Sequence, residues 1–214
     1  MLDNQAPPRW RRRKDERPAE IVAAALAVFA EKGFAAARLD EIAARAGLSK
    51  GTLYLYFADK ASIFRAVVAE AVAPNLEMVE AAADSFSGSF ADLVRTLVPT
   101  LARVASETPI GGVVKMVIGE SRNFPELAKV WHDDLVARAI AAMSSIVAAA
   151  QARGEVKPGD PRAYALGLIS PMLMGIIWRE TFEPIGAPAF DIEALARQHV
   201  ETVLAGMLTG KADA

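Results

Sequence analysis

Apolar residues recur at intervals of three or four along most of the chain, which is the period of an amphipathic α-helix. The first such stretch predicts a helix over residues 18–32, with Pro18 in its first turn and Gly33 just past its end. Its inward face carries Ile21, Ala25, Val28 and Phe29. No stretch alternates polar and apolar residues as a β-strand does. The pattern predicts an all-α protein.

Proline, glycine and short polar clusters divide the rest of the chain into further helices. We expect them at residues 39–46, 50–56, 60–83, 89–106, 110–121, 125–153, 161–182 and 191–209, which makes about nine helices in all. Pro74, Pro99 and Pro171 fall inside the longer segments, where proline kinks a helix or ends it.

Two of the predicted helices, 39–46 and 50–56, are short and are joined at Gly47. This arrangement has the dimensions of a helix-turn-helix, in which the second helix enters the DNA major groove. Gly47 permits a sharp turn, and the Ser49 hydroxyl is a suitable N-cap for the second helix. The exposed half of that helix then offers Ser49, Lys50, Gly51 and Thr52 to base edges and phosphates. The motif predicts a double-stranded DNA partner.

The segment from Phe34 to Phe64 resembles the N-terminal signature of the TetR family of transcriptional regulators. The matching elements are Ile42-Ala43, Ala46-Gly47-Leu48-Ser49, Gly51-Thr52-Leu53-Tyr54, Tyr56-Phe57 and Lys60. The resemblance implies a three-helix DNA-binding domain at residues 18–60 and a larger helical ligand-binding and dimerisation domain at 61–214. Residues 1–17 would be a flexible basic arm, either bound to DNA or simply solvated. The implied function is that of a homodimeric repressor, released from a palindromic operator when a small, largely apolar effector binds.

The resemblance also implies roles for single residues in the DNA-binding domain. Lys50, Gly51 and Leu55 would face bases, whereas Thr52, Tyr54, Tyr56 and Lys60 would contact phosphates. A second interpretation of Tyr54 and Tyr56 is that they cover the edge of the core. Arg38 stands where the family usually has Thr or Ser, so we expect it to reach a phosphate directly because it cannot act as an N-cap.

The larger domain offers effector-pocket candidates in Met116, Phe124, Trp131, Met143, Met172, Trp178 and Phe182. Side chains of these types at helical spacing more often belong to an ordinary core than to a ligand site. The dimer interface is expected on the last two helices, at Leu166, Ile169, Leu173, Ile176, Leu195, Val203, Leu204 and Met207. His132, Asp133 and Asp134 point about 100° apart on a regular helix and so predict no metal site.

Charge and composition limit the kinds of partner that the chain is expected to bind. Residues 1–60 hold 11 Lys and Arg against 8 Asp and Glu, whereas the whole chain has a net charge of −2, so only the N-terminal end favours a polyanion. The chain has no cysteine and its N-terminus lacks an apolar signal segment, which suits the cytoplasm. The apolar run from Ala163 to Trp178 is shorter than the roughly 20 residues that cross a bilayer, and we expect no membrane partner.

Motifs for catalysis are missing from the sequence. It contains no phosphate-binding glycine loop, no G-x-S-x-G, no H-E-x-x-H and no thiol, and we expect neither an enzyme nor a cofactor. The alternative function is a helical lipid- or small-molecule-binding module without DNA recognition, which leaves the motif between Gly47 and Lys60 unexplained. The sign of regulation stays open, since a DNA-binding domain serves activators and repressors equally.

Overall fold

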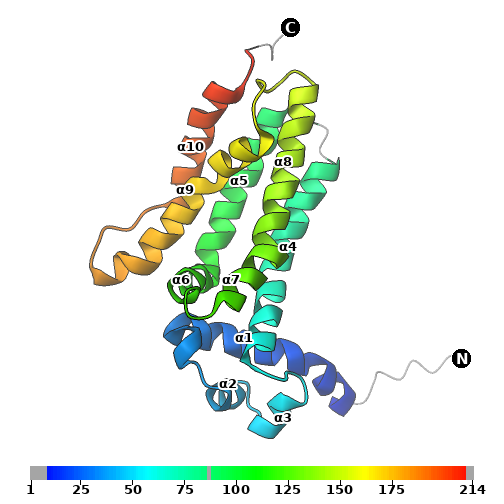
Figure 1. Ribbon diagram of the computed structural model, residues 1–214, viewed down its shortest axis with the longest axis vertical. Coiled ribbons are helices and arrows are strands. Elements are labelled where there is room, and N and C mark those ends of the chain that lie inside the picture. The colour runs from blue at the N-terminus through cyan, green and yellow to red at the C-terminus, as the bar shows by residue number, and fades with distance from the viewer. Residues whose placement is uncertain (1–8, 86–87, 211–214) are drawn as a thin grey trace, which may run out of the picture.

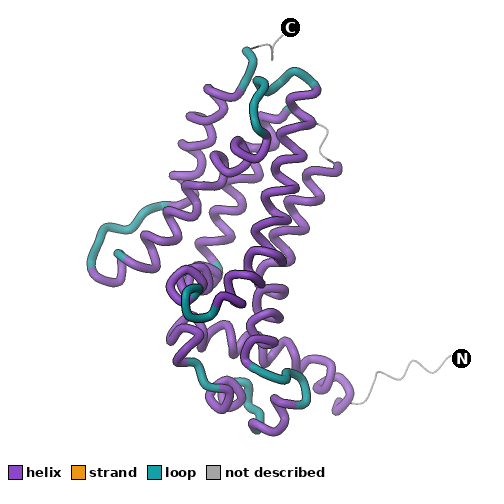
Figure 2. The backbone as a smooth tube through the Cα atoms, in the orientation of Figure 1, coloured by secondary structure: helices purple, strands orange, loops and turns teal. Residues whose placement is uncertain are grey.

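The computed structural model describes residues 9–85 and 88–210, and every regular element within these ranges is a helix (Figures 1 and 2). The expectation of an all-α architecture is confirmed. The helices are α1 (Arg9–Ala36), α2 (Leu39–Arg45), α3 (Lys50–Tyr54), α4 (Lys60–Ser85), α5 (Phe90–Glu107), α6 (Ile110–Glu120), α7 (Pro125–Trp131), α8 (Ala137–Ala152), α9 (Pro161–Thr181) and α10 (Ile192–Met207). A π-helical turn, His132–Val136, separates α7 from α8 and divides what the sequence predicts as one helix.

The helices form a small head and a long body (Figure 1). The head consists of α1, α2 and α3, and the body consists of the remaining helices, of which α4, α5, α8, α9 and α10 form a bundle that rises from the head. The shorter helices α6 and α7 lie at the end of the body nearest the head, where α6 contacts α1, and α7 contacts α4 and α6. The head therefore meets the body through α4, which continues the chain, and through α6, which contacts α1 from across the sequence.

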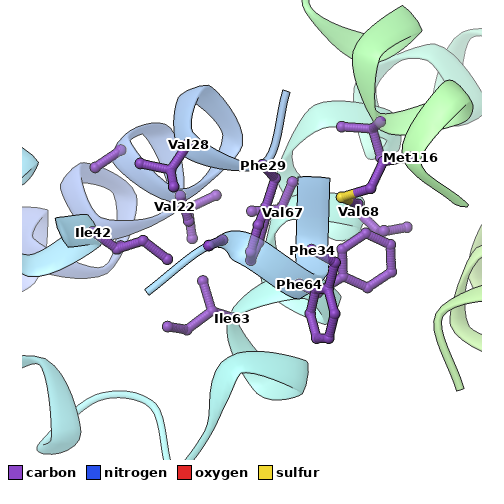
Figure 3. Packing of buried hydrophobic residues seen from close by; sticks show 14 of the residues in the cluster. Val22, Val28, Phe29, Phe34, Ile42, Ile63, Phe64, Val67, Val68 and Met116 are labelled. Atoms are coloured by element: carbon purple, nitrogen blue, oxygen red, sulfur yellow. The ribbon is translucent and has the colours of Figure 1, made fainter. Parts of the chain in front are cut away.

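Two apolar clusters match this division. The lower one joins the head to α4, α6 and α7 around Phe29, Phe34 and Phe64, whose rings lie 5.5–6.2 Å apart (Figure 3). The upper one fills the bundle with residues such as Phe90 and Met143. Because the lower cluster contains residues of both parts, including Met116 of α6, head and body are packed together and not merely tethered.

The N-terminal helix differs from its predicted bounds. It begins at Arg9, and Pro18 lies inside it instead of in its first turn. Residues 9–17 are mostly Arg, Lys and Glu, which favour helix, and the helix continues through Pro18 although proline removes one backbone donor and crowds the carbonyl of the preceding turn. The arm expected over residues 1–17 is thus helical from residue 9 onward, and residues 1–8 lie outside the described part. At the other end, Gly33 (φ 76°) breaks the helix where the sequence predicts, and a short turn, 34–36, follows it.

Among the described residues one helical stretch, Pro125–Ala152, is long and apolar enough to cross a membrane by length and composition alone. It consists of α7, the π turn and α8, not of the run from Ala163 to Trp178. Leu127, Met143 and Val147 of this stretch are buried, and α8 packs against α4 and α9. Helices in the cores of water-soluble bundles meet the same criterion, so this stretch is weak evidence for a membrane span.

Candidate nucleic-acid interface

The helix-turn-helix is braced from within by apolar residues of α2 and α3. Ile42, Ala43 and Leu53 are buried against α1 and α4 in the lower cluster. Gly47 adopts φ 69° in the turn, a conformation that favours glycine. The Ser49 hydroxyl accepts a hydrogen bond from the Thr52 backbone N–H at 3.1 Å and so caps α3 as the sequence predicts.

The outer face of α3 is available for contact. Lys50, Gly51, Tyr54 and Leu55 are exposed, with Leu55 82% and Tyr54 47% accessible. Burial of a leucine side chain stabilises a fold by about 1.5–3 kcal/mol. Leu55, which is exposed beside the end of α3, makes no such contribution to the stability of this protein. Thr52 is half-buried, and Tyr56 is half-buried against the lower cluster, where it covers the core edge. Each tyrosine therefore fits a different interpretation. The exposed Tyr54 is accessible to DNA, whereas Tyr56 is partly structural.

Three charged residues near the starts of α2 and α3 form a network of ion pairs. Arg38 Nη2 lies 3.0 Å from Asp40 Oδ2, and Lys50 Nζ lies 3.5 Å from Asp40 Oδ1. The Asp40 backbone N–H and the two cations keep the pKa of this carboxyl below its ordinary value, against a smaller opposing effect of burial. Arg38 makes no side-chain cap for α2, as expected, and is largely exposed. Asp40 was not among the residues singled out from the sequence.

Lys60 does not extend into solvent. Its ammonium donates to the carbonyl oxygens of Phe34, Ala35 and Ala37 at 2.5, 3.2 and 3.0 Å and lies 4.5 Å from the centroid of the Phe34 ring. Burial lowers the pKa of Lys60, and the nearby charge of Glu120 offsets part of that effect. In this structure the side chain predicted to hold a phosphate instead closes the junction between α1 and α2.

Glu120, at the end of α6, contacts the same junction and was missed at the sequence level. Its carboxylate accepts hydrogen bonds from the backbone N–H groups of Phe34 and Ala35 at 2.8 and 2.7 Å. These residues are separated by 86 and 85 positions in the chain, and no local pattern links them. The only related signal in the sequence is Gly33, which predicts the end of a helix.

The effector candidates do not converge on one site. Met116, Phe124 and Trp131 belong to the lower cluster, Met143 belongs to the upper one, and Met172 contacts both. Trp178, in the last turn of α9, packs on Phe182 and on Phe190, and its Nε1 donates to the Pro188 carbonyl at 2.8 Å. None of the candidates lines the open cavity of about 750 Å³, which is instead lined by Gln151, Arg153, Gly154, Glu155, Val156, Pro158, Gly159 and Thr209.

The residues expected at the dimer interface separate into two groups. Leu166 and Leu173 are 42% and 45% accessible on the outer face of α9, and Ile169, Leu195 and Val203 are half-buried. Ile176, Leu204 and Met207 are buried among residues of the same chain. The latter three were expected at the interface because α9 and α10 are apolar on more than one face, but their surface is already used inside the subunit.

Comparison with known proteins agrees with this architecture. Residues 21–67 match the model of bacterial regulatory proteins of the tetR family, and residues 85–203 match the tetracyclin repressor-like C-terminal domain. The chain is 46% identical over 55 residues to the HTH-type transcriptional activator FasR of Mycolicibacterium smegmatis, a match that covers 26% of this chain and 25% of FasR. It is 26% identical over 193 residues to the HTH-type transcriptional repressor BepR of Brucella suis, covering 86% of this chain and 88% of BepR.

Solved structures share the whole fold. A complex of SmeT, from Stenotrophomonas maltophilia, with triclosan has a TM-score of 0.77 at 20% identity and covers 91% of this chain and 93% of SmeT. FadR of Bacillus subtilis in complex with stearoyl-CoA has a TM-score of 0.71 at 21% identity, covering 88% and 98% of the two chains. The head is a DNA-binding helix-turn-helix, and the family consists of transcriptional regulators, not enzymes. The two matched segments together span most of the sequence, and the chain belongs to the TetR family of bacterial transcriptional regulators.

Proposed function

We propose that this regulator is a homodimeric repressor that leaves a palindromic operator when a small, largely apolar effector binds its body. The observation that carries the DNA-binding part is the open face of α3, where exposed Lys50, Tyr54 and Leu55 stand on a helix braced by buried Leu53. Lys50 and Gly51 would approach bases, Leu55 a thymine methyl group, and Tyr54 a phosphate.

The expected dimer uses the outer face of α9. Leu166, Ile169 and Leu173 recur there at helical spacing and keep accessible apolar surface in the single chain. Gly167, on the same helix, has open space where a Cβ would stand, which allows a partner helix to approach closely. Leu195 and Val203 of α10 would extend this contact, because both remain half-buried without a partner.

The nature of the effector is argued from relatives and from the body's composition. SmeT binds triclosan and FadR binds stearoyl-CoA, and both ligands have large apolar parts. In this chain Met172 contacts both clusters, and Trp131 and Phe124 are half-buried against the lower one. Rearrangement between the clusters would therefore open an apolar site next to the head. The match to the repressor BepR covers most of both chains, whereas the match to the activator FasR covers about a quarter of each chain. This difference favours repression over activation.

Fluorescence anisotropy with labelled DNA from the chain's own promoter region tests the DNA-binding part. We expect saturable binding, at least about 1,000-fold tighter than to scrambled duplex, and a steep fall of affinity with salt. Leu55→Ala should relax the preference for thymine at one position of each half-site, whereas Arg103→Ala on α5, outside the head and the expected dimer contact, should change nothing. Equal and weak binding to all duplexes, including those from a random library, would favour the alternative of a binding module without DNA recognition.

Stearoyl-CoA and triclosan then serve as probes of the effector site. Release of bound operator by either ligand at micromolar concentration supports the effector half of the proposal. A probe that binds the protein and leaves operator affinity unchanged counts against it. Transcription in vitro from the same promoter decides the sign, since a repressor lowers transcript yield when it is added and an activator raises it.

A further inference from the structure

The contact between Glu120 and the head is the only described side-chain contact in which a carboxylate of the body accepts from backbone N–H groups of the head. Its two oxygens accept from Phe34 and Ala35 at 2.8 and 2.7 Å. These are the first N–H groups after the break at Gly33, and such groups at the start of a helical turn have no partner within the turn. A body residue thus caps the turn that leads into α2.

Gly33 is shaped to admit this carboxylate. Its φ of 76° favours glycine, and a Cβ built on it would lie 2.3 Å from Glu120 Oε1. The close approach is repeated toward the other end of α6, where a Cβ on Gly112 would lie 2.9 Å from Ala30 Cβ. Helix α6 therefore fits against α1 at two points with no spare space, and Glu120 is the polar one of the two.

The opposite end of the turn is closed by Lys60. Its ammonium donates to the carbonyl oxygens of Phe34, Ala35 and Ala37. The turn is therefore held between a carboxylate at its N–H groups and an ammonium at its carbonyl groups, the polarity that favours each charge at a helix end. Since the chain continues directly from this turn into α2, Glu120 holds the point at which the helix-turn-helix begins.

Helix α6 is also fixed to α9, the helix proposed to carry the dimer interface. Lys115 donates to the Glu180 carbonyl oxygen, and a Cβ on Gly111 would lie 2.3 Å from Arg179 Nη2. Arg179 in turn donates to the carbonyl oxygens of Ala105 and Ser106 at the end of α5. A continuous set of contacts therefore runs from α9 through α6 and Glu120 to the head.

We propose that Glu120 is a positioning residue for operator binding, which sets the angle between head and body and with it the distance between the two recognition helices of a dimer. The inference rests on the proposed homodimer, because only a dimer has such a distance. A twofold regulator reads two half-sites at a fixed spacing, so freedom of the heads weakens binding to the full operator and leaves each half-site contact intact.

The test compares Glu120→Ala and Glu120→Gln with wild type, on full operator, on operators with the spacer changed by one or two base pairs, and on a single half-site. Glu107→Gln is the matched control, because Glu107 is an exposed glutamate at the end of α5 that pairs with Arg103 on the same helix. We expect Glu120→Ala to bind the full operator at least about tenfold more weakly than wild type, because it loses two hydrogen bonds to a charged group. The variant should also discriminate less among operators with different spacers. Half-site binding and the control should match wild type.

Amide hydrogen exchange reports on the contact without DNA. In Glu120→Ala the Phe34 and Ala35 amides should exchange at least tenfold faster than in wild type, while amides of Leu53 and Val67 keep their protection. Glu120→Gln keeps an acceptor oxygen and should lie between wild type and Glu120→Ala. If Glu120→Ala does not fold, Glu120→Gln alone supplies both measurements.

Three results would overturn the inference: an unchanged spacer preference, a parallel loss of half-site and full-operator binding, or unchanged protection of both amides. The parallel loss would mean that Glu120 only supports the fold of the head. Failure of the proposed function is distinguished from these, because it appears in wild type as a monomer in sedimentation or as binding without sequence preference. In a monomer the positioning role is overturned as well, even if the amides of Glu120→Ala exchange faster.

Discussion

The Lys60 ammonium lies 4.5 Å from the centroid of the Phe34 ring and donates to the Phe34 carbonyl oxygen, so one lysine joins the start of α4 to the end of α1. The lysine is thereby withdrawn from the surface where a phosphate would lie. Binding of DNA through Lys60 would require these contacts to be exchanged for a phosphate, whereas Lys50 needs only to leave its long contact with Asp40.

Lys60→Ala should therefore lower the stability of the free protein. We expect a loss of about 1–3 kcal/mol in the free energy of unfolding, since three carbonyl groups lose a charged donor and the ring loses a cation. Urea titration measures it. Lys50→Ala is the control: it should leave stability within about 0.5 kcal/mol of wild type and weaken binding to the operator, because Lys50 is a side chain expected to face bases. A Lys60→Ala protein of wild-type stability would contradict the structural role of this lysine.

Two glycines of α6 provide a matched pair for the contact between α6 and α1. A Cβ on Gly112 would lie 2.9 Å from Ala30 Cβ and 3.3 Å from Ala30 Cα, whereas a Cβ on Gly119 would meet nothing within 4 Å. Gly112→Ala should cost about 1–3 kcal/mol of stability, because backbone must move to admit the methyl group. Gly119→Ala should gain up to about 1 kcal/mol from the better helix former. Thermal or urea unfolding of both variants checks the prediction, and equal effects would disprove the close contact.

Leu173 is the best point at which to test the proposed dimer. It is 45% accessible on α9, and Leu173→Glu would place a charge in the centre of the expected apolar contact. We expect sedimentation equilibrium to show a monomer, or a dimer weakened at least about 100-fold, with the helical content retained. Ile118→Glu on α6, at a residue 55% accessible in the single chain, serves as the control and should remain dimeric. A Leu173→Glu protein that dimerises as wild type would move the interface elsewhere.

Glu155 predicts a pH dependence of stability at the far end of the body. Its carboxylate accepts from the Phe90 backbone N–H at 2.6 Å and pairs with Arg153. Burial raises the pKa of Glu155, but the Phe90 hydrogen bond and Arg153 together outweigh it and bring the pKa below its ordinary value of 4.5. The Glu155 carboxyl therefore binds a proton more readily in the unfolded chain than in the folded protein. Its contribution to the free energy of unfolding is complete above the pKa of the unfolded chain, and it is lost as the pH falls through the lower pKa of the folded protein.

Glu155→Gln should accordingly be less stable than wild type at pH 7, by about 1 kcal/mol, and the difference should shrink below about pH 4.5. Urea midpoints between pH 7 and the lowest pH at which both proteins fold would measure this. Glu193→Gln is the control, because Glu193 pairs with Arg197 on its own helix and makes an exposed ion pair. A difference between wild type and Glu155→Gln that does not change with pH would refute the role of the carboxylate charge.

The sequence by itself determined the parts of this protein that depend on neighbours in the chain. Helical periodicity gave the all-α class, and Gly33, Gly47 and Ser49 marked a helix end, a turn and a cap where the structure has them. The face proposed to contact DNA followed as well, because Lys50, Tyr54 and Leu55 lie within two turns of one another and their exposure depends mainly on the local helix.

Only the tertiary structure decided which long-range partner each residue takes. Periodicity shows that a helix has an apolar face but not what covers it, so Ile176 and Leu204 were expected at the dimer contact and lie inside the subunit, while Leu173 lies outside. Glu120 bonds to Phe34 across 86 positions, and Lys60 turns inward to the same residue. A charged side chain forms hydrogen bonds with unpaired backbone groups that the fold brings close to it. No local sequence pattern shows which backbone groups these are.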